Sequence, residues 1–350
     1  MSRFIDSSRI ESHAADVVRL LDSARVVHVV APTGAGRATL AAAIARCVGE
    51  QALCLSLPPF DSIDAPLHAL LQLGASFGEE GVLEAVDESV ALRERSKSLA
   101  ARAVKDDRVL IVRVPESWRI HDPTNYAATT FRQKRARDVL EPWFDGTGPR
   151  TVGLLVEHSG ASFAALATKT LVKRYPLAPI TVQSQALADE GQWTTYAPAA
   201  CKVAARIDVA ALTPLEIRLM VGLVALGEDV EELRRITSVP GRRSLAPLAN
   251  RMVACLALPK NQQLASGVQR LLAARFAVPR ALALDVADVP VEHAPLVTEC
   301  IGYGTDEIRV TDLVRKVLQS QLGRAPEHAE ATHLRLANHY EKLDGVAKWP

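Results

Sequence analysis

Hydrophobic positions in the first half of the chain alternate between short β-branched runs and stretches with helical spacing. Apolar residues recur every three or four positions in helical stretches, at about 8–21, 38–45, 65–73, 81–101, 127–144 and 161–169. Extended runs stand between them, at 26–30, 52–57, 108–114, 151–157 and 172–180. Strands that alternate with helices in this way predict an α/β domain with a parallel sheet, which we place at residues 1–185.

Beyond about residue 186 the hydrophobic pattern becomes helical. Helices are predicted at 187–207, 214–226, 230–236, 244–256 and 267–277, and no gap between them has the pattern of a buried strand. A hairpin is predicted from extended stretches at 299–303 and 308–310, followed by a helix over 311–321. Helices closed by a hairpin predict a winged-helix-like module. A last amphipathic helix, 326–343, has the small and aromatic spacing of the first helix of a helical repeat.

The strand that begins at Val26 runs into a glycine turn and then a helix. Backbone N–H groups of such a turn, and the free donors of the helix N-terminus, converge on a spot that favours an anion. An ordinary turn that joins a strand to a helix, with small residues for packing, explains the same pattern equally well. The candidate phosphate-binding residues are Gly34, Ala35, Gly36, Arg37, Ala38 and Thr39.

This turn departs from the phosphate-loop pattern G-x-x-x-x-G-K-[ST]. Ala31 replaces the first glycine, Arg37 the lysine and Ala38 the hydroxyl residue, and Thr39 comes one position late. Arg37 retains the ability to pair with a phosphate. Ala38 has no oxygen with which to ligate Mg²⁺. The turn therefore predicts a loop that holds a nucleotide and cleaves it poorly.

Charge and composition exclude several classes of protein. The chain has 350 residues with 41 basic and 40 acidic side chains, so no global basic field attracts nucleic acid or a membrane surface. No apolar run approaches the ~18 residues of a membrane span, and the first residues lack the apolar core of a signal peptide. The five scattered cysteines without metal spacing are typical of reduced thiols, so we expect a cytoplasmic protein.

Several stretches follow one another in an order that carries a resemblance. They are Phe4-Ile5, the glycine turn, SLPPFDSIDAPLHALLQLGA, RVLIVRVPESW, GLLVEHSG, YPLAPIT and IRVTDLVRKVL. In this order the chain resembles the STAND branch of AAA+-related ATPases, which includes NB-ARC and NACHT proteins. The resemblance implies a P-loop-type α/β core at 1–185, a helical lid at 186–285 and a winged-helix-like module at 286–325, which together clamp ADP or ATP. The helix in 326–350 follows them.

The resemblance also implies an eroded metal site. In RVLIVRVPES the family has a metal-binding aspartate at the strand end, and here that position is Arg113. Glu116 lies further on, and an exposed loop carboxylate is the simpler interpretation of it. Because Ala38 and Arg113 together remove both Mg²⁺ ligands, we expect most of the hydrolysis rate to be lost. Arg37 and Arg113 can between them replace the charge of the metal, which favours either nucleotide binding without turnover or an empty, salt-bridged site. We assign no catalytic residue and no metal ligand.

Three further positions correspond to nucleotide contacts of the family. His158 stands where the family has a polar sensor, and Pro176 or Pro179 where a proline packs on adenine. Thr311 and Asp312 stand where the family has a histidine and an aspartate, so the aspartate is retained and the histidine is lost. Simpler interpretations are a surface histidine, a loop proline and an N-cap pair.

Three functions remain open from the sequence. The first is a degenerate STAND-like ATPase that acts as a regulator or scaffold with a protein partner, an effector or a sensor. The family's uses in signal transduction, bacterial defence and transcriptional control are implied by resemblance alone. The second is a slow NTPase that uses Arg37, Thr39 and Glu116. The third is a DNA-binding regulator, for which we find less support, with basic residues Arg132, Lys134, Arg135, Arg137, Arg234, Arg235, Arg242, Arg243 and Arg309.

Overall fold

The computed structural model divides the chain into two compact units. The N-terminal unit is residues 8–178, and the C-terminal unit is residues 179–350 together with 1–7. The structure describes residues 7–57, 65–78, 89–115, 131–144, 147–156, 172–177, 196–238, 245–274, 278–303, 307–322 and 326–341. Of the helices within these ranges, none combines the length and apolar character that crossing a membrane requires.

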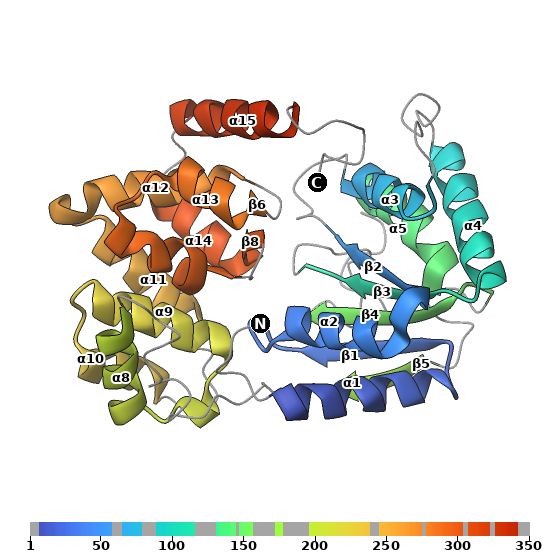
Figure 1. The fold of residues 1–350 in the computed structure, drawn as a ribbon, viewed down its shortest axis with the longest axis horizontal. Coiled ribbons are helices and arrows are strands. Elements are labelled where there is room, and N and C mark those ends of the chain that lie inside the picture. The colour runs from blue at the N-terminus through green and yellow to red at the C-terminus, as the bar shows by residue number, and fades with distance from the viewer. Residues whose placement is uncertain are drawn as a thin grey trace. The chain divides into compact units, whose positions relative to one another are not determined.

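A five-stranded parallel sheet forms the centre of the N-terminal unit (Figure 1). The strand order is β2-β3-β4-β1-β5. Strand β1 lies between β4 and β5, and all of its residues are buried, which accounts for its unbroken apolar run. The predicted parallel α/β domain is therefore confirmed. The strands are β1 (Val26–Ala31), β2 (Ala52–Ser56), β3 (Val109–Arg113), β4 (Arg150–Val156) and β5 (Val172–Pro176).

Helices of the N-terminal unit pack against this sheet and against one another. They are α1 (Ser7–Leu21), α2 (Arg37–Val48), α3 (Ala65–Ala75), α4 (Ser89–Lys105) and α5 (Phe131–Phe144). Helix α2 contacts β2 and β3, whereas α3, α4 and α5 contact each other. One buried cluster joins these three helices to the sheet through Leu70, Leu99, Trp143 and Phe144. The helix predicted at 161–169 lies outside the described residues.

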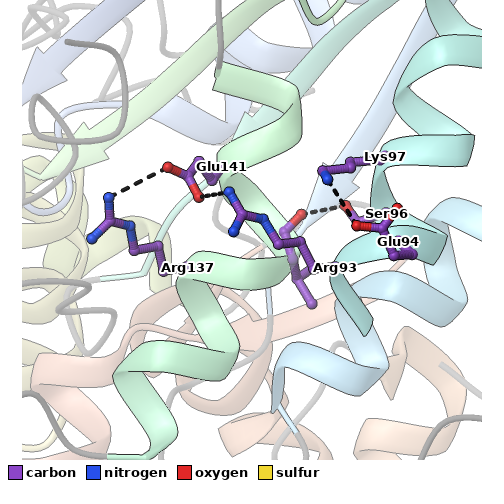
Figure 2. A network of polar contacts seen from close by, with 7 residues as sticks. Arg93, Glu94, Ser96, Lys97, Arg137 and Glu141 are labelled. Carbon is purple, nitrogen blue, oxygen red and sulfur yellow. Dashed lines mark hydrogen bonds and ion pairs between the residues drawn. The ribbon is translucent and has the colours of Figure 1, made fainter. Parts of the chain in front are cut away.

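Polar contacts connect α4 to α5 on the surface and in the core. In Figure 2 the side chains of Arg93 and Arg137 both point to Glu141, at 2.9 and 3.3 Å. These exposed ion pairs contribute little to stability. Below them the indole Nε1 of Trp143 donates to the buried Ser96 hydroxyl at 2.9 Å. That hydroxyl donates in turn to the Val139 carbonyl at 2.5 Å, so this buried pair is fully hydrogen bonded.

The C-terminal unit is mostly helical, as predicted. Helix α9 is buried along most of its length and begins with a capping box, in which Thr213 and Glu216 each bond the other's backbone N–H. The helices are α8 (Ala197–Arg206), α9 (Pro214–Ala225), α10 (Val230–Thr237), α11 (Leu245–Leu256), α12 (Gln262–Ala273), α13 (Arg280–Ala287), α14 (Asp312–Leu322) and α15 (Pro326–Glu341).

A small antiparallel sheet lies in the same unit, in the order β6-β8-β7. Its strands are β6 (Val278–Pro279), β7 (Gly302–Tyr303) and β8 (Glu307–Val310). The predicted hairpin is present as the β7–β8 pair. The strand β6 is not in the sequence prediction, because two residues leave no periodicity to recognise.

Two predicted elements of this unit differ in the structure. Residues 299–301, predicted as strand, belong to a π-helical segment, η10 (Leu296–Ile301). This segment packs closely on Gly222 of α9: a Cβ on Gly222 would lie 3.0 Å from Leu296 and Cys300. The helix predicted at 267–277 is α12, which begins at Gln262 after a 3-10 turn and ends at Ala273. The domain boundaries at 185, 285 and 325 stay predictions.

Candidate phosphate-binding loop

The predicted loop residues lie together where β1 ends and α2 begins. Gly34 and Gly36 adopt left-handed backbone conformations, with φ of 85° and 93°. Side chains with a Cβ rarely adopt this conformation, so the turn requires glycine at both positions. Between them Ala35 is fully buried, and its N–H donates to the Pro32 carbonyl at 3.3 Å. The loop is therefore a tight turn shaped by its glycines.

The N-terminus of α2 offers donors to an anion at this loop. Gly36 is the N-cap residue, and glycine has no side chain with which to cap the helix. The first N–H groups of a helix have no partner within it, and the helix dipole makes this end positive. The first turn of α2 contains no acidic residue that would oppose an anion. Ala38 and Thr39 lie in this turn and are half-buried.

Arg37 is directed to the carboxyl ends of two strands. Its Nη1 donates to the Val114 carbonyl at 2.9 Å and to the Leu154 carbonyl at 3.2 Å. Val114 follows β3 and Leu154 lies in β4, so the guanidinium spans both strand ends. Its charge therefore lies at the same edge of the sheet as the glycine turn.

Arg113 stands where the resemblance implies a metal-binding aspartate, and its side chain is bonded to the neighbouring strand. Its Nε and Nη2 donate to the Ser56 hydroxyl at 3.1 and 2.5 Å, and the two residues are register partners in β3 and β2. A guanidinium cannot ligate a cation. In the part of the chain that the structure describes, no group of three or more His, Cys, Asp or Glu side chains is placed to hold a metal ion.

The remaining predicted contacts are placed only in part. Glu116, His158 and Pro179 lie outside the described ranges. Pro176 is the exposed last residue of β5, and it pairs with Val30 of β1. Asp312 begins α14 in the C-terminal unit, away in sequence from the glycine turn.

Of the two residues that the sequence offers as an N-cap pair for α14, Thr311 does not cap the helix through its side chain. Its carbonyl accepts a hydrogen bond from the Arg315 N–H at 2.9 Å. Its Oγ1 is buried, however, and has no hydrogen-bond partner within the described ranges. The hydroxyl is therefore not used as a cap, although threonine is a common N-cap residue.

Of the nine basic residues named for DNA binding, Arg137, Arg234 and Arg235 form ion pairs with acidic residues nearby. Arg234 and Arg235 each form an ion pair at 3.1 Å, with Glu231 and Glu232 one turn earlier on α10. Arg309 lies in β8 and is half-buried. Arg242 and Arg243 fall outside the described ranges. The arginines of α10 therefore form a solvated helix face with its own counter-charges.

Sequence reasoning missed the groups that hold Arg37 and Arg113. Ser56 carries no motif, and the two carbonyl acceptors have no side-chain signal at all. The pairing of β2 with β3, which brings Ser56 opposite Arg113, depends on strand order. A register assignment for these two strands would have found Ser56.

Comparisons with known proteins add little to this geometry. No family model and no curated protein matches the sequence. Among solved structures, the chain is similar to the Walker-type ATPase of Pyrococcus abyssi, with a TM-score of 0.39 and 9% sequence identity. The similarity covers 90% of this chain and 96% of that one. A similarity at this level leaves the function of the chain to be argued from its own residues.

Proposed function

We propose that the loop of residues 34–39 binds the phosphates of ADP or ATP and that the chain hydrolyses them poorly or not at all. The observation that carries the proposal is the left-handed backbone of Gly34 and Gly36 at the end of β1. In the order β2-β3-β4-β1-β5, the strands β2, β3 and β4 lie on one side of β1, and β5 lies on the other side. The connections therefore change direction at β1. The carboxyl ends of strands at such a switch point are where open α/β sheets bind ligands.

Poor hydrolysis follows from the residues around the loop. Phosphoryl transfer depends on positioning and on neutralising charge, which Mg²⁺ usually supplies. Ala38 offers no oxygen to a metal, and Arg113 brings a positive charge that repels one. Arg37 can supply part of the missing positive charge, because a guanidinium pairs with two phosphate oxygens at once.

We propose further that the chain is a degenerate STAND-like regulator or scaffold that acts through a protein partner, an effector or a sensor. The order η10, β7, β8, α14, with β8 in the middle of its sheet, supports the winged-helix-like module at 286–325, although the third strand of that sheet, β6, comes from before residue 286. The helices before it are compatible with a lid at 186–285. We favour this role over DNA binding because Arg234 and Arg235 are paired on their own helix.

The nucleotide content of the purified protein tests the proposal. The protein is denatured, and the supernatant is separated by anion-exchange chromatography. We expect ADP or ATP in the wild type and at least tenfold less in Arg37→Ala, because a hydrogen bond to a charged group is worth about 1.5–3 kcal/mol. Arg46→Ala is the matched control, since Arg46 is an exposed arginine of the same helix.

Magnesium dependence distinguishes a nucleotide clamp from a slow NTPase. Because Ala38 and Arg113 provide no metal ligand, the affinity for ADP should change less than about twofold when EDTA replaces Mg²⁺. Isothermal titration measures it. Absence of nucleotide, with no binding of added ADP or ATP, would overturn the proposal. Mg²⁺-dependent release of phosphate that Arg37→Ala abolishes would favour the active NTPase.

A further inference from the structure

A pocket of about 500 Å³ lies at the amino ends of the strands of the five-stranded sheet. We call this end the amino edge, and the end that carries the glycine turn the carboxyl edge. Its walls come from the turn after α1, the turn after α4 and the residues that begin β1, β3 and β4. The volume is within the range of about 300–1,000 Å³ that is usual for small-molecule sites. The pocket is lined by Leu21, Asp22, Ser23, Ala24, Arg25, Val104, Asp107, Arg108, Pro149 and Arg150.

Three of the residues that line the pocket are arginines at the starts of neighbouring strands. Arg25 directly precedes β1, Arg108 directly precedes β3, and Arg150 is the first residue of β4. These strands are adjacent in the order β3-β4-β1, and adjacent strands are about 4.8 Å apart. The sheet therefore brings three guanidinium groups to one short stretch of its edge.

Each of these arginines has hydrogen-bond donors to spare. Arg25 donates to the Gly148 carbonyl at 2.8 Å, Arg108 donates to the Glu50 carbonyl, and Arg150 donates to Asp107 at 3.1 Å. Within the described ranges each guanidinium is bonded through one nitrogen. A guanidinium carries five N–H donors, so most of the donors of the three groups remain available to a ligand.

The acidic side chains of the pocket neutralise only part of the positive charge of the three arginines. Asp107 is held by Arg150 and by the Gln51 side chain at 3.3 Å, and Asp22 is exposed. Helices α1 and α4 both end beside the pocket, and the negative ends of their dipoles weaken its positive charge further. The number of donors, more than the net charge, therefore decides which ligand fits.

We propose that this pocket binds the phosphate group of a small phosphate monoester. Phosphate oxygens are acceptors only, and arginine forks bind them two at a time. Leu21, Ala24, Val104 and Pro149 supply apolar wall for the organic part of the ligand. Strand β1 has six residues, so its length of about 20 Å separates this pocket from the glycine turn. The proposal does not depend on nucleotide binding at that turn.

Titration of the full chain with ribose 5-phosphate, and separately with inorganic phosphate, tests this pocket. Isothermal titration at low ionic strength should give saturable binding with a dissociation constant of about 1 mM or below. Tighter binding of ribose 5-phosphate than of inorganic phosphate indicates an organic ligand, and equal binding indicates free phosphate. Both results support a phosphate site.

Variants assign the signal to the pocket. Arg25→Gln and Arg108→Gln should each weaken binding at least about tenfold. Arg19→Gln, at an exposed arginine of α1 that lies outside the pocket, should leave it unchanged. Arg37→Ala should also leave it unchanged, which separates this site from the glycine turn. Circular dichroism confirms that each variant is folded. Absence of saturable binding, or binding lost only in Arg37→Ala, would overturn the proposal.

Discussion

The two edges of the five-stranded sheet both carry arginines, but these arginines are bound differently. At the carboxyl edge Arg37 bonds the carbonyls of Val114 and Leu154, and Arg113 bonds Ser56, so both act across the ends of the strands. At the amino edge Arg25 donates to the Gly148 carbonyl, just before β4, and Arg108 donates to the Glu50 carbonyl, just before β2. A pocket of about 500 Å³ lies at this edge. Arginine therefore connects the ends of strands at the carboxyl edge and lines a pocket at the amino edge.

This difference indicates which groups would bind a ligand at each edge. At the carboxyl edge the backbone of Gly34 and Gly36 shapes the candidate site, and its proposed donors are main-chain N–H groups together with the Arg37 side chain. At the amino edge the donors are side-chain guanidinium groups. Binding at the first edge should therefore respond to changes of backbone conformation as well as to the loss of the Arg37 charge, and binding at the second to changes of side-chain charge.

Removal of the core beneath both edges should have the largest effect. Trp143 is fully buried in α5, donates to Ser96, and accepts at its carbonyl a 2.9 Å hydrogen bond from Thr151 in β4. We expect Trp143→Ala to lower the free energy of unfolding by about 3–5 kcal/mol. Urea unfolding followed by circular dichroism measures this loss.

Leu334→Ala provides the matched control for the tryptophan. Leu334 is 62% exposed on α15, so its truncation should cost no more than about 0.5 kcal/mol. Trp143→Ala should also weaken ligand binding at both edges of the sheet, since both depend on this core. Loss of binding at one edge alone would show that the edges are supported separately.

The backbone of the glycine turn should have the next largest effect. Gly36→Ala places a Cβ on a residue with φ of 93°, which costs about 1–3 kcal/mol of stability. Gly49→Ala is the control, because Gly49 has φ of 73° at the other end of the same helix, and nothing lies within 4 Å of its Cβ position. Both variants should lose similar stability, but only Gly36→Ala should lose bound nucleotide, as chromatography of the denatured protein would measure. If both variants retained the same amount of nucleotide, the glycine turn would not be part of the nucleotide-binding site.

The sheet could be predicted from the sequence because its physics is local. The buried run of β1 and the β-branched residues of β3 and β4 give extended stretches with no other reading, and the helices between them keep regular spacing. The segment at 299–301 could not be assigned from its apolar run alone. Its close packing against α9 depends on Gly222, far away in the sequence, which lets Leu296 and Cys300 approach that helix.

The candidate sites were predictable only where a motif stands in one stretch. Gly34 to Thr39 form such a motif, and the structure places them where β1 leads into α2. Arg25, Arg108 and Arg150 meet only through the strand order, which the hydrophobic pattern does not reveal. Their shared position at the start of a predicted strand was the available signal, and strand order would have turned it into a site.

The ion pair at the pocket should have the smallest effect on stability. Arg150 and Asp107 are 3.1 Å apart, with 33% and 70% of their side chains exposed. A double-mutant cycle of Arg150→Gln and Asp107→Asn should give a coupling of about 0.2–1 kcal/mol that shrinks as salt is added. Asparagine suits this position because Asp107 has φ of 48°, a conformation that asparagine tolerates.

The variant Asp107→Asn should change ligand binding at the amino edge and not at the carboxyl edge. Asp107→Asn releases Arg150 from its partner and removes an acidic group from the pocket. Ribose 5-phosphate should therefore bind several-fold more tightly to this variant, while nucleotide retention at the glycine turn stays unchanged. Unchanged binding of ribose 5-phosphate would mean that Arg150 does not contact the ligand. The pocket would then depend on Arg25 and Arg108, whose partners are main-chain carbonyls that no side-chain substitution removes.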